Sequence, residues 1–310
     1  MADLQSTIKS QDTEEWIDIV FTRPIGYLWA LFFRRLGVHP NVVTVLSMVL
    51  GAAAGVCFFF SPATSEHWFL INVAGVLLLM WANFYDSCDG QLARMTGQKT
   101  RLGRILDGAA GDIWYISIYF ALLFRMWNEP IPFTGMNWGI VGFLLLAFDG
   151  FVCHTRQCRL ADYYRNIHLF FLKGEAGSEL DNYLQQKALY EQTPWRGDVV
   201  WKFFLFTYVN YTYEQEKTTP EFQRLMKRLQ AMYGTNIPQA FRDRFRRLSR
   251  PILWCTNALT FNQRALALYA ACLLNQPWLL LVFEIFYLGG IYFYMKRRHE
   301  SFCRALADEL

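Results

Sequence analysis

The sequence has few charged residues and few features of a soluble or secreted protein. Asp, Glu, Lys and Arg make up 18% of its 310 residues, whereas soluble proteins contain about 25%. The net charge of only +4 disfavours nucleic acid as a partner. The seven cysteines include no C-x-x-C pair, so we expect reduced structural thiols rather than a cysteine metal site. Residues 1–20 lack the cationic start of a secretory signal peptide, and we expect none.

Hydrophobic residues are abundant instead, and they gather into long runs that make up much of the 54% hydrophobic content. Each of six runs approaches the roughly 20 residues needed to cross the hydrocarbon core of a bilayer. The runs cover residues 42–60, 69–88, 105–126, 137–155, 253–274 and 277–295. We therefore predict an all-α integral membrane protein with about six transmembrane helices.

The basic residues are unevenly distributed between the two sides of this predicted membrane topology. The links near residues 61–68, 127–136 and 275–276 contain no Lys or Arg. All but two of the 30 basic residues, Arg125 and Arg264, lie outside both the spans and these links. By the positive-inside rule, we place both termini and the 93–104 link on the cytoplasmic side of the cytoplasmic membrane.

The remaining segments complete the predicted organisation. Residues 24–36 are too short to span a bilayer and carry Trp29 and two arginines, which is typical of an interfacial helix. A long segment between the fourth and fifth spans is predicted to be a helical cytoplasmic insertion, with a helix beginning near Pro220. The regions are 1–40 (tail and interfacial helix), 41–156 (spans one to four), 157–250 (insertion), 251–296 (spans five and six) and 297–310 (cytoplasmic tail).

A group of small, acidic and basic residues joins the second and third spans. Carboxylates are costly next to a membrane core, so a functional role is expected, although surface acids in a solvated loop are the alternative. Asp86 and Asp89 are three residues apart and share a helix face, and Asp107 lies on the next predicted helix. If these helices pack together, the three carboxylates can converge on a hard cation such as Mg²⁺ or Mn²⁺.

The pattern D-x2-D-G-x2-A-R-x8-G-x3-D at residues 86–107 resembles that of the CDP-alcohol phosphotransferases, integral-membrane enzymes of phospholipid synthesis. The resemblance extends loosely over residues 25–156. It implies that Asp86, Asp89 and Asp107 hold metal, with two Mg²⁺ or Mn²⁺ ions. The residues implied to bind the CDP-linked donor are Asn41, Thr44, Gly90, Ala93, Arg94 and Gly103. For Asn41, capping of the first span is an equal alternative.

The chain departs from the family pattern at one position. The family has a fourth Asp four residues after the third, where this chain has Gly111, and Asp112 follows one place later. In a regular α-helix this shift turns the side chain from about 40° to about 140° away from Asp107. We expect a π-bulge eased by Gly108 and Gly111 to return Asp112 to the site, as a metal ligand and the catalytic base.

The implied reaction transfers a phosphatidyl group from CDP-diacylglycerol to a small polar alcohol and releases CMP. The reverse arrangement, with a soluble CDP-alcohol and diacylglycerol, fits the motif equally well. Arg156, Arg159 and Arg264 favour a phosphorylated acceptor such as inositol phosphate or glycerol phosphate, although the first two could simply enforce topology and bind lipid headgroups. A transporter and a non-catalytic scaffold are the competing classes. Members of the family commonly dimerise, so a homodimer is an open alternative.

Overall fold

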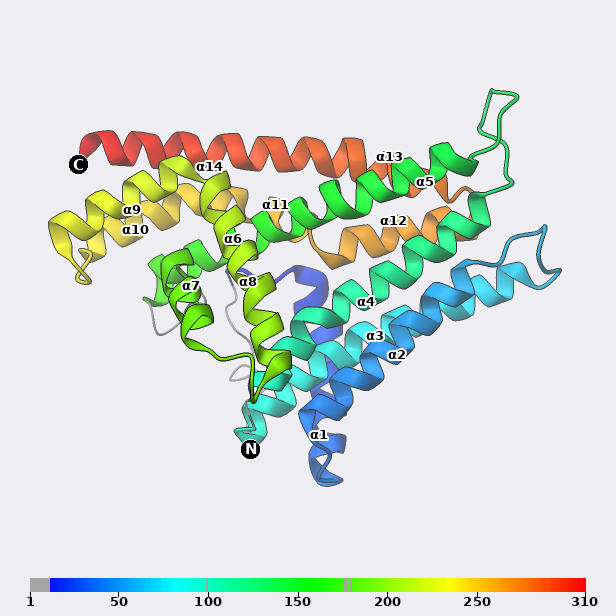
Figure 1. Cartoon of the computed structure of the whole chain (residues 1–310), viewed down its shortest axis with the longest axis horizontal. Coiled ribbons are helices and arrows are strands. Elements are labelled where there is room, and N and C mark those ends of the chain that lie inside the picture. The colour runs from blue at the N-terminus through cyan, green and yellow to red at the C-terminus, as the bar shows by residue number, and fades with distance from the viewer. Residues whose placement is uncertain (1–11, 99, 175–177, 179) are drawn as a thin grey trace. The chain divides into compact units, whose positions relative to one another are not determined.

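The computed structural model describes residues 12–98, 100–174, 178 and 180–310, and this part of the chain is helical with no β-strand (Figure 1). The first residues of the predicted N-terminal tail lie outside the described residues. The chain divides into two compact units. Unit 1 comprises residues 1–154 and 262–285, and unit 2 comprises residues 155–261 and 286–310. The prediction of an all-α integral membrane protein is confirmed.

Five helices in the described part of the chain are long and apolar enough to cross a membrane. They are α2 (Pro40–Phe58), α3 (Trp68–Thr96), α4 (Arg101–Met126), the continuous helix Gly139–Lys173 and the continuous helix Trp278–Glu309. The predicted span at 253–274 is divided into α11 (Leu253–Ala258) and α12 (Phe261–Leu273). At about 1.5 Å per residue, thirteen residues reach only about 20 Å of the roughly 30 Å core. The count of six spans is therefore not confirmed.

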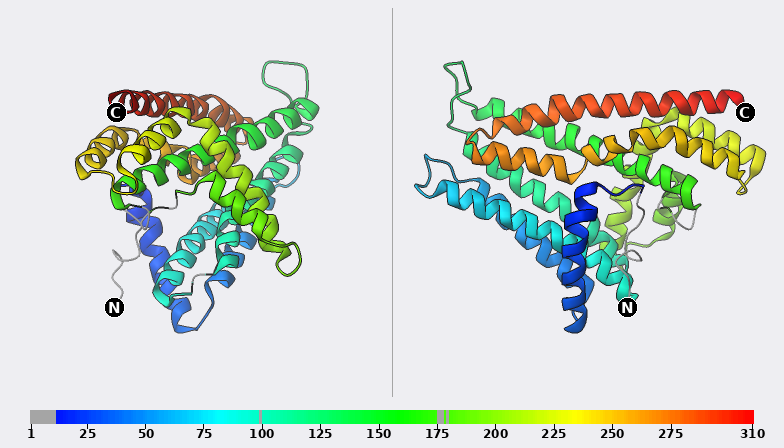
Figure 2. Two further views of the ribbon diagram at one scale, coloured as in Figure 1. Left: turned by 60° about the vertical axis from the view of Figure 1, so that its left-hand side comes forward. Right: turned by 180° about the vertical axis from the view of Figure 1, so that it is seen from behind.

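The helices α2, α3 and α4 lie side by side in unit 1, as both figures show (Figures 1 and 2). Two glycines of α2 allow α4 to approach closely. A Cβ atom on Gly51 would lie 2.0 Å from Cδ1 of Trp114, and one on Gly55 would lie 2.3 Å from Oγ of Ser117. The Trp114 indole donates a hydrogen bond to the carbonyl of Ser47 at 3.1 Å. Small residues four apart are a common way for membrane helices to pack.

The N-terminal part of unit 1 is a π-helical turn, η2 (Asp18–Thr22), followed by α1 (Arg23–Arg35). This helix matches the short helix predicted at 24–36. It packs against α3: a Cβ on Gly26 would lie 2.9 Å from Oγ of Ser87, and the ring of Trp29 lies 5.4 Å from that of Tyr85. α1 therefore rests on the same stretch of α3 that carries the acidic motif.

The insertion is helical, as predicted. Unit 2 contains α6 (Thr155–Lys173), α7 (Tyr183–Gln192), α8 (Val199–Thr218), α9 (Pro220–Tyr233), α10 (Gln239–Ser249), α11 and α14 (Gly289–Glu309). Pro220 begins α9 as expected. The core of unit 2 contains stacked rings. The ring centroids lie 3.8 Å apart both for Phe171 and Phe245 and for Tyr164 and His299.

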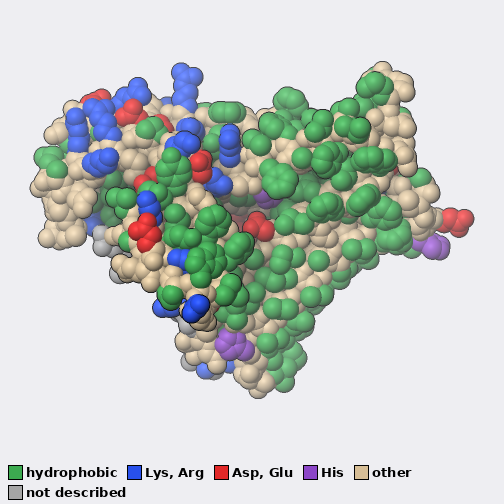
Figure 3. Space-filling model, viewed as in Figure 1, with side chains coloured by type: hydrophobic (Ala, Val, Ile, Leu, Met, Phe, Trp, Pro, Cys, Tyr) green, Lys and Arg blue, Asp and Glu red, His purple; other side chains and the backbone are tan. Residues whose placement is uncertain are grey.

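The surfaces of the two units differ in character. Large apolar side chains are exposed along α2, α4 and α5 (Gly139–Phe148), among them Val49, Phe120 and Leu144. Hydrophobic side chains accordingly cover this region in the space-filling view, whereas Lys and Arg gather over unit 2 (Figure 3). Exposed apolar side chains on long helices are expected where the solvent is lipid.

Candidate metal and phosphate site

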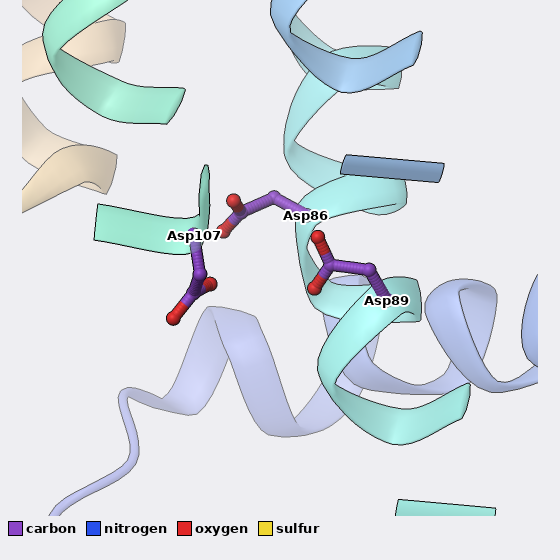
Figure 4. Close-up of side chains that lie close together, drawn as sticks. All are labelled: Asp86, Asp89 and Asp107. Carbon is purple, nitrogen blue, oxygen red and sulfur yellow. The ribbon is translucent and has the colours of Figure 1, made fainter. Parts of the chain in front are cut away.

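Three carboxylates from two helices come together in unit 1 (Figure 4). Asp86 and Asp89 project from α3 and Asp107 from α4, and one oxygen of each lies within 4.8 Å of the others. Asp89 is only 4% exposed, Asp86 is half-buried and Asp107 is exposed. The structure therefore brings together the three residues predicted from the motif.

Helix-capping residues, rather than the limits of the hydrophobic runs, set this geometry. α3 continues eight residues beyond the predicted end of its span and stops at Thr96, where Gly97 takes a left-handed conformation with φ of 70°. Thr100 then caps α4 by accepting a hydrogen bond from the amide of Gly103 at 2.9 Å. Both helices pack against α2, and because the link between them is short, the acidic end of α3 lies close to that of α4.

The donor set fits a hard divalent cation. All three side chains offer carboxylate oxygens, the ligands that Mg²⁺ and Mn²⁺ prefer, and no thiol or imidazole belongs to the group. Three carboxylates held this close together repel one another unless a cation or protons neutralise them. The grouping thus supports divalent-metal binding.

Thr44 of α2 contacts this group directly. Its hydroxyl donates a hydrogen bond to Oδ2 of Asp89 at 2.5 Å, and the side chain is 2% exposed. Such a partner fixes the orientation of a ligand carboxylate. Sequence reasoning had expected Thr44 near the nucleotide; the contact assigns it a positioning role toward Asp89, and the predicted donor contact remains a prediction.

Arg94 and Gly90 form the next layer of the site. The three atoms nearest to a Cβ atom on Gly90 would all belong to the guanidinium of Arg94, the closest of them at 3.5 Å. Nε and Nη2 of Arg94 are buried and have no hydrogen-bond partner in the described part of the chain. The guanidinium lies within electrostatic range of Asp89 and Asp107. A cation with buried N–H groups left over, next to a glycine, is suited to an anionic ligand such as a phosphate. Ala93, also predicted to face the donor, is half-buried on the same helix.

Asn41 and Gly103 lie against each other at the cytoplasmic ends predicted for α2 and α4. A Cβ on Gly103 would lie 2.8 Å from Oδ1 of Asn41. The capping alternative for Asn41 is wrong, because His39 caps α2 by accepting from the Asn41 amide at 3.1 Å. The Asn41 side chain instead pairs weakly with Thr100, at 3.5 Å.

Asp112 is not part of the group. α4 is a regular α-helix throughout Arg101–Met126, so the predicted π-bulge is wrong for this helix. A Cβ atom on Gly108 or Gly111 would meet no atom of the described residues within 4 Å, so no neighbour crowds this stretch of α4. Asp112 is exposed and lies within electrostatic range of His154.

The three arginines predicted to bind the acceptor divide between the units. Arg156 and Arg159 belong to unit 2 and line a pocket there. Arg264 belongs to unit 1, where its Nη1 lies 2.6 Å from Oε2 of Glu284 with both side chains fully buried. Its guanidinium is occupied by a carboxylate of the chain, so we do not carry Arg264 into the proposed acceptor site.

Sequence reasoning missed two features of unit 1. Arg23 lies within electrostatic range of Asp86, although the sequence gives no signal linking residues so far apart. The Tyr119 hydroxyl donates to Glu284 at 2.7 Å and lies 2.9 Å from Nδ1 of His154. Both His154 and Glu284 lie in π-helical turns, η3 (Asp149–His154) and η6 (Phe283–Leu288). Glu284, an acidic residue within the apolar run at 277–295, was the sequence signal that could have indicated the contact with Tyr119.

Comparison with known proteins supports the resemblance inferred from the motif. The model of the CDP-alcohol phosphatidyltransferase family matches residues 37–164. That range contains all three carboxylates of the site. The resemblance is therefore confirmed over this part of the chain.

One similar protein is an archaetidylinositol phosphate synthase from Aeropyrum pernix. It is 36% identical over 108 residues, which cover 34% of this chain and 50% of that protein. The chain thus spans about half the length of this relative. No solved structure matches the chain.

Proposed function

We propose that this protein transfers a phosphatidyl group from CDP-diacylglycerol to the hydroxyl of a small polar alcohol, with release of CMP. The observation that carries the proposal is the convergence of Asp86, Asp89 and Asp107 within 4.8 Å, inside the region that matches the family. Transfer from a diphosphate needs groups that hold two phosphates and stabilise the departing one, and this site offers carboxylates for metal beside an arginine.

In the proposed site, Asp86, Asp89 and Asp107 hold Mg²⁺ or Mn²⁺. Such an ion, when bound, neutralises phosphate charge and stabilises the leaving CMP. Thr44 keeps the Asp89 carboxylate in one orientation through its 2.5 Å hydrogen bond. Arg94 binds a donor phosphate with its buried N–H groups, and the missing side chain of Gly90 gives that phosphate room.

The reaction itself is a displacement at the phosphorus nearer the lipid. The acceptor oxygen forms a new bond to that phosphorus, the bond to the CMP oxygen breaks, and the acceptor hydroxyl loses its proton to a base. We propose Asp112 as that base because it is the next carboxylate after Asp107 on α4.

Two substitutions test the role of Asp112. Asp112→Asn should reduce turnover by about 10² to 10⁴-fold, the usual contribution of a positioned base. Gly111→Asp restores the family spacing on the same helix face as Asp107, where an added Cβ meets nothing within 4 Å. We expect Gly111→Asp to recover turnover in the Asp112→Asn background. Normal turnover in Asp112→Asn alone would remove Asp112 from the mechanism.

We further propose that the acceptor is a phosphorylated polyol, such as inositol phosphate or glycerol phosphate, and that the site faces the cytoplasm. The name of the Aeropyrum relative supports the acceptor, and the distribution of Lys and Arg supports the orientation. The purified protein should be given CDP-diacylglycerol and one acceptor at a time, and the lipid product identified by mass spectrometry. A product with inositol or serine but none with a phosphorylated polyol would overturn this choice of acceptor.

A further inference from the structure

Unit 2 contains a basic pocket of about 280 Å³ whose lining comes from three helices. α6 contributes Arg156 and Arg159, α8 of the insertion contributes Lys217, and α14 contributes Lys296. This volume lies just below the roughly 300–1,000 Å³ of typical ligand pockets, so a small ligand fits. Lining residues from different helices lie more than fifty residues apart in the chain, so no local sequence pattern predicts the pocket.

The charges of the lining are strongly unbalanced. Four cationic side chains face one carboxylate, Glu214, which already lies 3.6 Å from Lys217. No carboxylate pairs with Arg156, Arg159 or Lys296 among the residues that the structure describes. Like charges brought together in a concave site repel one another, and an anion removes that cost. The electrostatics thus favour a multiply charged anion.

Neighbouring side chains hold Arg159 of this pocket in place. The guanidinium of Arg159 lies 5.5 Å from the ring centre of Tyr211, and its Nε is buried without a hydrogen-bond partner. The Tyr211 hydroxyl donates to Asp162 at 3.0 Å. Burial and the nearby Asp162 carboxylate raise the pKa of Tyr211, so the phenol keeps its proton and this bond persists. Arg159 is thereby directed by its neighbours rather than left as a free surface charge.

Neutral polar side chains accompany these cations. Gln215, Thr218 and Tyr292 line the same pocket. Hydroxyl and amide groups of this kind recognise hydroxyls on a ligand, whereas the cations recognise a phosphate. The combination suits a phosphate monoester that also carries hydroxyl groups better than it suits a bare inorganic ion.

We propose that this pocket binds a phosphate monoester, and that the insertion serves to complete it through Lys217. The phosphate could belong to a soluble phosphorylated polyol or to a phosphatidic acid headgroup, since both present the same chemistry. The soluble source would make the pocket a binding site for the acceptor of the proposed function. Binding measured without turnover tests the pocket separately from that function.

The test is calorimetric titration of the full-length protein, held in phosphatidylcholine nanodiscs, with glycerol phosphate and with inositol phosphate. In a second arm, nanodiscs with and without phosphatidic acid are compared for competition with the soluble probe. We expect Lys296→Gln and Lys217→Gln each to weaken binding about tenfold, which corresponds to about 1.4 kcal/mol, whereas Lys296→Arg retains it. Lys187→Gln, on α7 outside the pocket, is the matched control.

The outcomes are distinct. Binding of a soluble probe that the pocket variants weaken and phosphatidic acid leaves unchanged assigns the pocket to a soluble ester. Displacement of the probe by phosphatidic acid assigns it to a lipid headgroup. Absence of binding in both arms overturns the proposal, as does equal weakening by Lys187→Gln. If Lys296→Gln fails to fold, Lys217→Gln still decides, because that side chain is largely exposed.

Discussion

The close contact between α2 and α4 makes Gly51 a sensitive test of how the site is held. In Gly51→Ala the new Cβ would lie 2.0 Å from the Trp114 ring, whereas carbon atoms prefer about 3.5–4.0 Å. Either the indole or a helix must therefore move by more than about 1 Å. The indole is restrained by its hydrogen bond to Ser47, so we expect α2 and α4 to separate.

The expected magnitude follows from two opposing effects. Overpacking of a tight interface costs about 1–3 kcal/mol, and replacing glycine by alanine within a helix returns about 1 kcal/mol. The difference between the two effects predicts that Gly51→Ala lowers the free energy of unfolding by up to about 2 kcal/mol. The effect on catalysis should be larger, because a shift of about 1 Å in a catalytic group can cost about 10²-fold in rate, and α2 and α4 carry Thr44 and Asp107.

The assay compares Gly51→Ala with Gly290→Ala, a helical glycine of α14 whose added Cβ meets nothing within 4 Å. Thermal unfolding in detergent and CMP release are measured on both variants. We expect a lower unfolding midpoint and much lower turnover for Gly51→Ala alone. If the two variants have the same unfolding midpoint and both release CMP normally, the close contact between α2 and α4 does not position the site.

Two further predictions concern buried polar contacts. Glu284→Gln removes the carboxylate that lies 2.6 Å from the buried Arg264, so we expect a loss of about 3 kcal/mol in stability, measured as a lower unfolding midpoint. Glu309→Gln, from an exposed pair, should change nothing measurable. An unchanged midpoint for Glu284→Gln would contradict the reading of that pair as buried and intact. Thr44→Val removes the hydroxyl that orients Asp89 and should raise the half-saturating Mg²⁺ concentration about tenfold or more, with little change in stability. Unchanged metal dependence would show that Thr44 does not act through Asp89.

Much of the fold could be predicted because long apolar runs identify membrane helices in a sequence. The runs at 42–60, 69–88 and 105–126 correspond to α2, α3 and α4, since about 20 apolar residues in lipid must satisfy their backbone hydrogen bonds internally. Hydropathy does not report where a helix ends in a polar region. Gly97 and Thr100 set the ends of α3 and α4 there, so the predicted boundaries of these spans were too short.

The site was predictable where chemistry and spacing coincide. Asp86 and Asp89 share a helix face by periodicity alone, and Asp107 joins them because the intervening link is short. The contact of Thr44 with Asp89 was not predictable, because it depends on the rotation of α2 against α3. The direction of the Asp112 side chain depends on whether α4 is a regular α-helix or contains a π-bulge, and the sequence pattern did not distinguish these two structures.

The most direct test of the proposed function is CMP release from CDP-diacylglycerol by the purified protein as Mg²⁺ or Mn²⁺ is titrated. A phosphorylated polyol serves as the acceptor. Asp107→Asn should abolish the metal-dependent release, whereas Asp243→Asn, an acidic residue in α10 of unit 2, should leave it intact. We predict release that requires both metal and acceptor and that EDTA removes. Release that persists in EDTA, or that survives Asp107→Asn, would contradict the assignment of the three carboxylates as the metal site of a phosphatidyl transfer.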